Sequence, residues 1–146
     1  MPRLVDGDNL LGSWPERGRS EGERRALARE IASLARDLKR QVVLVFDGEP
    51  PPGLDLGPDV RFSGRGHSAD DLVLEILRAQ VDPRGWTVVT NDRALQDRCR
   101  HAGARVERCD AFRERLTRAA PPEKPAASRD VAYWMEVFGE DEGPAD

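Results

Sequence analysis

The sequence predicts an α/β domain with a mostly parallel sheet and helices on both faces. Short apolar runs at residues 3–5, 42–46 and 86–90 are separated by stretches with helical periodicity. The run Val42–Phe46 is apolar throughout, which is typical of a parallel strand buried on both faces. Strands that alternate with helices favour parallel pairing through right-handed crossovers, so a three-layer arrangement is expected.

The first half of the chain contains two expected strands and one long helix. Arg3–Val5 is the first strand, and the turn-prone residues Asp6–Asn9 end it. A helix is expected over Ser20–Arg40, because Ser20 and Glu23 have the spacing of a capping box. Its buried face is predicted at i, i+4, i+7 and i+11, which are Leu27, Ile31, Leu34 and Leu38. The second strand, Val42–Phe46, follows.

The second half continues the alternation after a segment rich in Pro and Gly. Residues 49–58 are not expected to form regular structure, and Val60–Ser63 is expected to be a short edge strand. A helix begins at Ser68, with an apolar side made by Leu72, Leu74, Ile76 and Leu77. The remaining predicted elements are a strand at Trp86–Thr90, a helix to about Ala102, a strand at Ala104–Val106 and a helix around Ala111–Arg118.

The chain divides by composition into three parts. A folded domain is expected over residues 1–118, an Ala/Pro-rich linker over 119–128, and an acidic tail over 129–146. The spacing i, i+3, i+4 and i+7 predicts a short amphipathic helix in the tail, formed by Val131, Trp134, Met135 and Phe138. Its apolar face requires a cover, and the sequence leaves open its own domain, a second copy of the chain or another protein.

The net charge of −4 does not exclude a nucleic-acid partner, because the charge is unevenly distributed. From Pro121 onward there are seven acidic and two basic residues, which leaves 21 basic and 20 acidic residues before that point. The two cysteines, Cys99 and Cys109, lack the spacing of a zinc or redox motif. No apolar run approaches the roughly 20 residues that span a bilayer. A cytoplasmic protein without a membrane partner is expected.

Aspartates are placed at or just after the ends of three predicted strands. These are Asp6, Asp47 and Asp92, while Asp70 and Asp71 fall in the first turn of the helix that begins at Ser68. Sites in open α/β sheets lie at the C-terminal ends of the strands, so we expect one acidic cluster. Carboxylates this close require a cation, and oxygen ligands select Mg²⁺ or Mn²⁺. The chemistry expected of such a site is hydrolysis of a phosphodiester bond.

Polar neighbours of these acids are candidates for supporting roles. Asn9 is expected to orient the Asp6 carboxylate or a metal-bound water, and Thr90 and Asn91 to contact phosphate or a water. Each acid also has a purely structural alternative, since turns and helix N-caps favour aspartate. Together the acids are stronger evidence, because unrelated turns need not place an acid on every strand that reaches one edge.

Four segments, in this order, resemble the NYN domain and most closely its bacterial YacP-like branch. They are Leu4–Leu11, Val45–Gly48, Ser68–Asp71 and Val89–Asp92. The resemblance extends over about Leu4–Leu116 and implies a PIN-like fold. It also implies a divalent-metal ribonuclease, expected to be an endonuclease, that acts in bacterial RNA processing or decay.

The resemblance also ranks the residues of the expected site. Carried over by position, it implies that Asp6, Asp70 and Asp92 are the main metal-binding acids. The residues that assist them are Asn9, Asp47 and Asp71. Asp8 is a departure from the family, which often has an aromatic residue at this position.

Arginines near the acidic motifs are expected to bind the phosphates of RNA, including ribosome-associated mRNA. Arg65 precedes Asp70, and Arg93 follows Asp92. Five more arginines follow the first motif, namely Arg17, Arg19, Arg24, Arg25 and Arg29. The alternative for the helix arginines is pairing with glutamates of the same helix, which are Glu21, Glu23 and Glu30.

Two rival functions remain open at this point. Asp6-Gly7-Asp8 also resembles the nucleophile and acid of haloacid dehalogenase-like phosphatases. Those enzymes need a lysine near the site, and none lies between Lys39 and Lys124. The second rival is a non-catalytic RNA- or ribosome-binding module, whose expected sign is loss of the acids. None of the expected acids is missing, which favours an enzyme.

Overall fold

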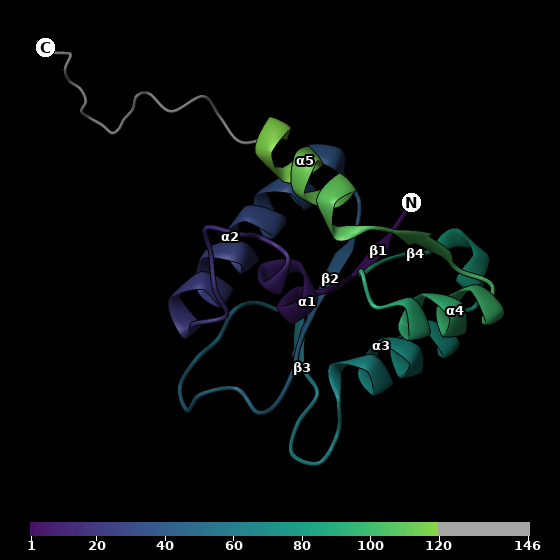
Figure 1. Cartoon of the computed structure of the whole chain (residues 1–146), viewed down its shortest axis with the longest axis horizontal. Coiled ribbons are helices and arrows are strands. Elements are labelled where there is room, and N and C mark those ends of the chain that lie inside the picture. The colour runs from purple at the N-terminus through teal and green to yellow at the C-terminus, as the bar shows by residue number, and fades with distance from the viewer. Residues whose placement is uncertain (120–146) are drawn as a thin grey trace, which may run out of the picture.

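A five-stranded parallel sheet forms the middle layer of the computed structural model, which describes residues 1–119 (Figure 1). The strand order is β3-β2-β1-β4-β5, and each neighbouring pair is parallel. The strands are β1 (Arg3–Asp6), β2 (Val42–Phe46), β3 (Val60–Phe62), β4 (Thr87–Val89) and β5 (Arg105–Glu107). This arrangement confirms the predicted fold class, including the edge position of β3.

Helices cover both faces of the sheet. One outer layer contains α1 (Gly7–Gly12), α2 (Glu21–Leu38) and α5 (Cys109–Ala119). The other layer contains α3 (Ala69–Arg78) and α4 (Arg93–His101), and Figure 1 shows these two helices on the opposite side of the strands. A 3-10 turn at Pro83–Gly85 leads into β4. The expected linker and tail helix lie outside the described residues.

Alternating side chains of the strands build two separate cores. Val5 of β1 packs in the core beneath α2 and α5, together with Phe46 and Phe112. Leu4 points to the opposite face and packs in the core beneath α3 and α4, together with Val73. Because successive strand residues face opposite sides, the apolar runs had to be apolar on both faces.

Helix caps follow the predicted chemistry. The Ser20 hydroxyl accepts a hydrogen bond from the Glu23 backbone N–H at 3.2 Å, and α2 begins there. The Ser68 hydroxyl accepts from the Asp71 N–H at 3.1 Å at the start of α3. These bonds satisfy backbone donors that the first turn of a helix leaves unpaired.

Three details differ from the sequence-based expectations. The segment after Asp6 is not a turn but the short helix α1, whose Leu10 and Leu11 are buried. Leu38 is predicted to be buried, but it is 43% exposed because α2 extends past the core at that end. Val73 is absent from the predicted apolar side of α3, although it is fully buried.

The start of α1 requires a residue without a side chain. A Cβ atom at Gly7 would lie 2.5 Å from the Phe46 ring, which is itself fully buried and cannot move aside. Glycine therefore lets the helix leave β1 at close range to β2. This close approach brings the start of α1 against β2.

The chain order of the strands determines where a site forms. From β1 the chain continues to β2 and β3 on one side, and then returns to β4 and β5 on the other side. The connections therefore diverge next to β1, between β1 and β4. In open α/β sheets, ligands bind in the crevice at such a switch point.

Candidate active site

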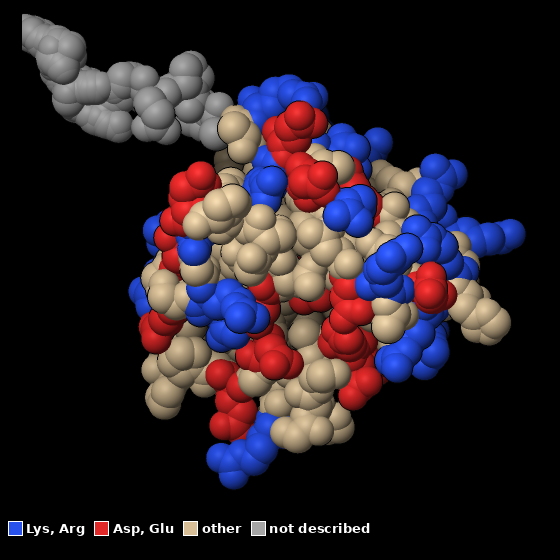
Figure 2. Space-filling view, in the orientation of Figure 1, with Lys and Arg blue, Asp and Glu red and all other residues tan. Residues whose placement is uncertain are grey.

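A hollow of about 420 Å³ opens at the C-terminal ends of β1, β2 and β4. Figure 2 shows acidic side chains on both sides of a depression in the middle of this face, with basic side chains farther out. The residues that line the pocket are Asp6, Asp8, Asn9, Arg19, Arg24, Asp47, Ser68, Ala69, Asp70 and Asp92. We call Asp8, Arg19 and Arg24 the α1–α2 wall, and Asp70 and Asp92 the α3–α4 wall.

Asp6 is a buried carboxylate without a cationic partner. It ends β1, is 5% exposed, and accepts a hydrogen bond from the Thr90 hydroxyl at 3.1 Å. Within residues 1–119, no basic side chain forms an ion pair with it. Burial, with a smaller contribution from the charge of Asp70, raises the pKa of Asp6 to about 6, although the hydrogen bond from Thr90 lowers it. The ionised form of Asp6 therefore lacks a counter-charge in this pocket.

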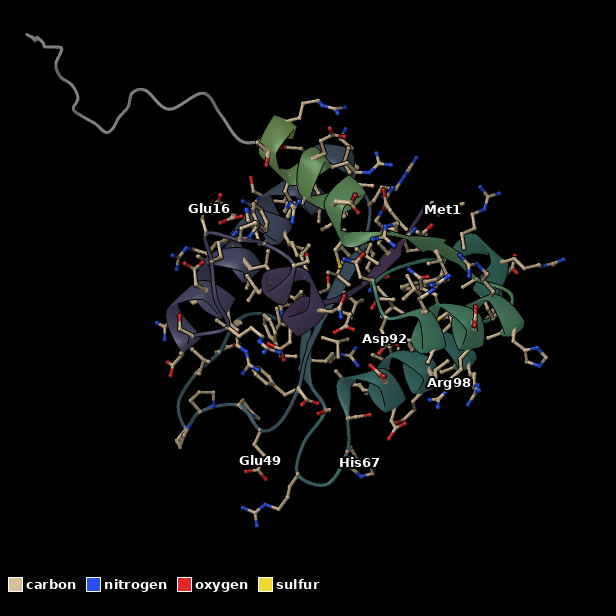
Figure 3. The ribbon with its side chains drawn as sticks, in the orientation of Figure 1. Met1, Glu16, Glu49, His67, Asp92 and Arg98 are labelled. Carbon is tan, nitrogen blue, oxygen red and sulfur yellow. The ribbon has the colours of Figure 1, made fainter. Side chains whose placement is uncertain are left out.

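The α3–α4 wall brings two more acids close together. Asp92 is the N-cap of α4, where its Oδ1 accepts from the Leu95 N–H at 3.2 Å, and it also lines the pocket. Burial raises the pKa of Asp70, and the neighbouring charge of Asp92 raises it further. In Figure 3, Asp92 lies between α1 and the α3–α4 layer, facing the middle of the molecule. Asp92 therefore caps α4 and lines the pocket at the same time.

The α1–α2 wall holds an acid that its own chain neutralises. Asp8 is 8% exposed and forms a bidentate pair with Arg24, with Nε–Oδ1 at 3.0 Å and Nη2–Oδ2 at 2.8 Å. The Asp47 backbone N–H also donates to Asp8 at 2.8 Å. The Arg24 guanidinium stacks on Phe46 with its carbon 5.0 Å from the ring centre. Both oxygens of Asp8 are therefore engaged by donors of the chain itself.

Asp47 lines the pocket but has a structural task as well. Its Oδ1 accepts from the Ala69 N–H at 2.9 Å, and the Ser63 hydroxyl lies 3.5 Å away. These bonds tie the start of α3 to the end of β2. The structure thus brings Asp47 to the site with one oxygen already engaged.

Asn9 is held in one orientation by donors on two segments. Its Oδ1 accepts the Asn91 N–H at 2.7 Å and the Cys109 S–H at 3.3 Å. A backbone N–H can only donate, so Oδ1 and not Nδ2 must face Asn91. Burial raises the pKa of Cys109 to about 11, so its thiol keeps the proton that it donates. The Nδ2 group of Asn9 is left as the donor on the pocket side.

Three residues expected at the site either line another hollow or have a polar atom engaged in a hydrogen bond within the protein. Asp71 does not line the acidic pocket but a neighbouring groove between α3 and α4. Thr90 is fully buried, and its hydroxyl also accepts the Asp92 N–H at 3.1 Å. The Asn91 Oδ1 accepts from the Cys109 N–H at 2.8 Å. The Thr90 hydroxyl and the Asn91 Oδ1 therefore hold the loop after β4, and the expected contacts of these residues with a phosphate or a water stay predictions.

The expected RNA-binding arginines divide into paired and unpaired groups. Arg17 is held by Glu23 at 2.6 Å and by both oxygens of Glu30. Arg65 lies 3.4 Å from Glu49, in an exposed loop. Arg19 and Arg93 form no ion pair within residues 1–119, and Arg19 lines the pocket. Arg19 and Arg93 thus keep a free guanidinium near the acids.

Two residues of the site have partners that the sequence does not reveal. The sequence offers Arg24 as a candidate for binding RNA, whereas in the structure its guanidinium pairs with Asp8. The sequence assigns no role to Cys109, but its thiol donates to the Asn9 Oδ1 in the structure. Neither partnership has a local signal, because the pairs are 16 and 100 residues apart in the chain.

The donor set of the pocket fits a hard divalent cation. Asp6, Asp70 and Asp92 offer only carboxylate oxygens, which magnesium and manganese prefer. Asp6 in particular is buried without a basic partner, so a cation there would neutralise it. Across the part of the chain that the structure describes, no three Asp, Glu, His or Cys side chains already stand at ligating distance from a common point. A cation would have to draw these carboxylates together.

A parallel α/β sheet with aspartates from β1, α3 and α4 around one pocket defines a PIN-like nuclease domain. The chain belongs to the YacP-like NYN domain family, which matches residues 3–132. This confirms the family predicted from the four segments.

Solved structures support the same fold. The chain is similar to Rae1 (YacP) from Bacillus subtilis, at 19% identity and a TM-score of 0.67, covering 99% of this chain and 84% of that chain. It is equally similar to the W164L mutant of Rae1, with the same identity and TM-score, covering 97% of this chain and 84% of that chain. No curated protein matches the sequence.

The helices α1 to α5 are amphipathic or short. Among residues 1–119, none of the helices combines the length and apolar character needed to cross a membrane.

Proposed function

We propose that this protein is a ribonuclease that depends on Mg²⁺ or Mn²⁺ and cleaves RNA internally, in RNA processing or decay in the cytoplasm. The observation that carries the proposal is the contrast between acids of one pocket. Asp8 has an arginine partner, while Asp6, Asp47, Asp70 and Asp92 have none within residues 1–119. A chain that supplies a partner for one acid of the pocket and leaves the other four without any is suited to receive a cation from outside.

Each side chain has a defined part in the proposed reaction. Asp6, Asp70 and Asp92 hold the ion, which when bound supplies charge neutralisation and Lewis acidity for attack on the phosphodiester. Asn9 donates from Nδ2 to an oxygen of the substrate. Arg19 binds a substrate phosphate at the pocket rim.

The test is cleavage of single-stranded RNA by the purified full chain. We expect cleavage with Mg²⁺ or Mn²⁺ and none with EDTA. Asp92→Asn should abolish cleavage with the fold intact, because Asn still caps α4 but has lost the negative charge. The matched control is Asp97→Asn, which changes an exposed acid on the same helix and should leave cleavage unchanged.

Two outcomes would contradict the proposal. Full activity in both Asp6→Asn and Asp92→Asn would remove the site. Hydrolysis of a small phosphomonoester that Asp6→Asn abolishes, without RNA cleavage, would favour the phosphatase alternative. The pairing of Asp8 with Arg24 argues against that alternative, since its acid must be free to donate a proton.

A further inference from the structure

A second groove lies beside the acidic pocket, between α3 and α4. It has a volume of about 490 Å³ and is lined by Asp71, Leu74, Glu75, Arg78 and Arg98. Asp70 lines the pocket and Asp71 lines the groove, so the two hollows share the first turn of α3. The pocket and the groove therefore lie on either side of this turn.

Arg78 and Arg98 have free guanidinium groups in this groove. Both are exposed, and within residues 1–119 neither forms an ion pair. Glu75 lies three residues before Arg78 on α3, a spacing that often supports a pair, but this pair does not form. Each helix therefore contributes one unpaired cation to the same hollow.

The basic side chains of the groove belong to a larger basic surface. In Figure 3, Arg98 lies on the far side of Asp92 from α1, at the outer edge of the α3–α4 layer. Figure 2 shows basic side chains gathered along this side of the molecule.

We propose that the α3–α4 groove is a second phosphate subsite for the RNA strand, in which Arg78 and Arg98 bind a phosphate beyond the scissile bond. The inference rests on the proposed ribonuclease function. Two arginines from different helices hold a phosphate from two sides, which a single surface arginine cannot do. Asp71 and Glu75 line the same groove and reduce its positive potential.

The test compares RNA binding by long and short strands. Fluorescent single-stranded RNAs of about 16 and about 4 nucleotides are titrated in EDTA, since single-strand sites extend over such lengths. The double variant Arg78→Gln/Arg98→Gln should weaken binding of the longer RNA about tenfold and leave the shorter one unchanged. The slope of log K against log salt should become shallower by about 0.7 for each phosphate that the variant no longer binds.

Matched variants separate the groove from general surface charge. Arg84→Gln/Arg100→Gln removes two positive charges from residues already paired with Asp82 and Asp97, and it should change binding much less. Glu75→Gln should strengthen binding of the longer RNA, because it removes a negative charge from the groove. A subsite in the groove thus predicts that affinity for the longer RNA rises in the Glu75 variant and falls in the double arginine variant.

The possible failures are distinguishable. If the wild-type chain binds neither RNA in EDTA, this inference is overturned, whereas the proposed function is judged separately by RNA cleavage with Mg²⁺ or Mn²⁺. If the wild-type chain binds RNA and the groove variant binds equally well, only the inference is overturned. Equal losses in the groove variant and the Arg84/Arg100 variant would likewise overturn it, because charge alone would then explain the effect.

Discussion

The carboxylates on the two walls of the acidic pocket differ in whether the chain supplies them with a basic partner. On the α1–α2 wall, Asp8 is fixed by Arg24 and by a backbone N–H. On the α3–α4 wall, Asp70 and Asp92 face each other with raised pKa at Asp70, and Asp6 lies between the walls without a counter-charge. A buried carboxylate that has a partner stabilises a fold, whereas one without a partner costs stability. The acid of the α1–α2 wall thus contributes to stability, whereas we propose that the acids of the α3–α4 wall bind a cation.

The largest effect is expected from breaking the pair on the α1–α2 wall. Arg24→Gln leaves Asp8 charged and nearly buried, so the free energy of unfolding should fall by about 3 kcal/mol. Urea denaturation measures this loss. Arg25→Gln, which breaks an exposed i,i+4 pair with Glu21 on the same helix, should cost less than about 0.5 kcal/mol.

The same substitution at two acids should have opposite effects on stability. In EDTA at pH 7, Asp6→Asn should stabilise the protein by up to about 3 kcal/mol, since a raised pKa means that ionisation opposes folding. Asp8→Asn should destabilise it, because the amide loses the bidentate pair with Arg24. Thermal unfolding of the two variants measures both effects. Shifts of the unfolding temperature in the same direction would contradict the comparison.

The pH dependence of Asp6 sharpens this prediction. The folded pKa of about 6 lies above the ordinary value of 3.8, so between these values the folded state binds more protons than the unfolded state. Stability contributed by Asp6 is therefore present below about pH 4 and is lost as the pH rises through 6. Relative to Asp6→Asn, the wild-type chain should lose stability over this range, and added Mg²⁺ at pH 7 should restore it.

A smaller effect is expected from the residue between the two acids. Gly7→Ala places a methyl group 2.5 Å from the Phe46 ring, which should cost about 1–3 kcal/mol and shift Asp6 relative to Asp8. Urea denaturation again measures the cost. Gly12→Ala at the other end of α1 has no atom within 4 Å of the new methyl group and should be neutral or stabilising.

The smallest effect concerns the hydrogen bond from Asn9. Asn9→Asp retains the oxygen that accepts from Asn91 and removes the Nδ2 donor. The rate of cleavage should therefore fall about tenfold, which corresponds to a rise of about 1.4 kcal/mol in the activation free energy. Affinity for Mn²⁺, measured by calorimetry, should not decrease. Unchanged cleavage would show instead that Asn9 acts through an oxygen.

The sequence predicted the parts of the fold that depend on local signals. The strand Val42–Phe46 and the caps Ser20 and Ser68 need only neighbouring residues for their identification. Helix α1 was missed because Gly, Asp and Asn are poor helix formers. It is held by burial of Leu10 and Leu11, which is a tertiary effect.

The candidate site was predictable at the level of strand ends but not of side-chain direction. Asp6 and Asp92 follow strands that meet at one edge, and the strand pattern alone places them together. Asp70 and Asp71 are adjacent in sequence, yet a helix turns consecutive residues by about 100°, so they line different hollows. The Arg24 partner of Asp8 depends on how α2 packs, which no local pattern encodes.

The buried hydroxyl of Thr90 has a consequence for motion. It donates to Asp6 at the end of β1 and accepts from the backbone of Asp92 after β4. The hydroxyl therefore links the end of β1 to the segment that follows β4. A cation that draws the Asp6 and Asp92 carboxylates together would move two segments that are already joined through this one side chain.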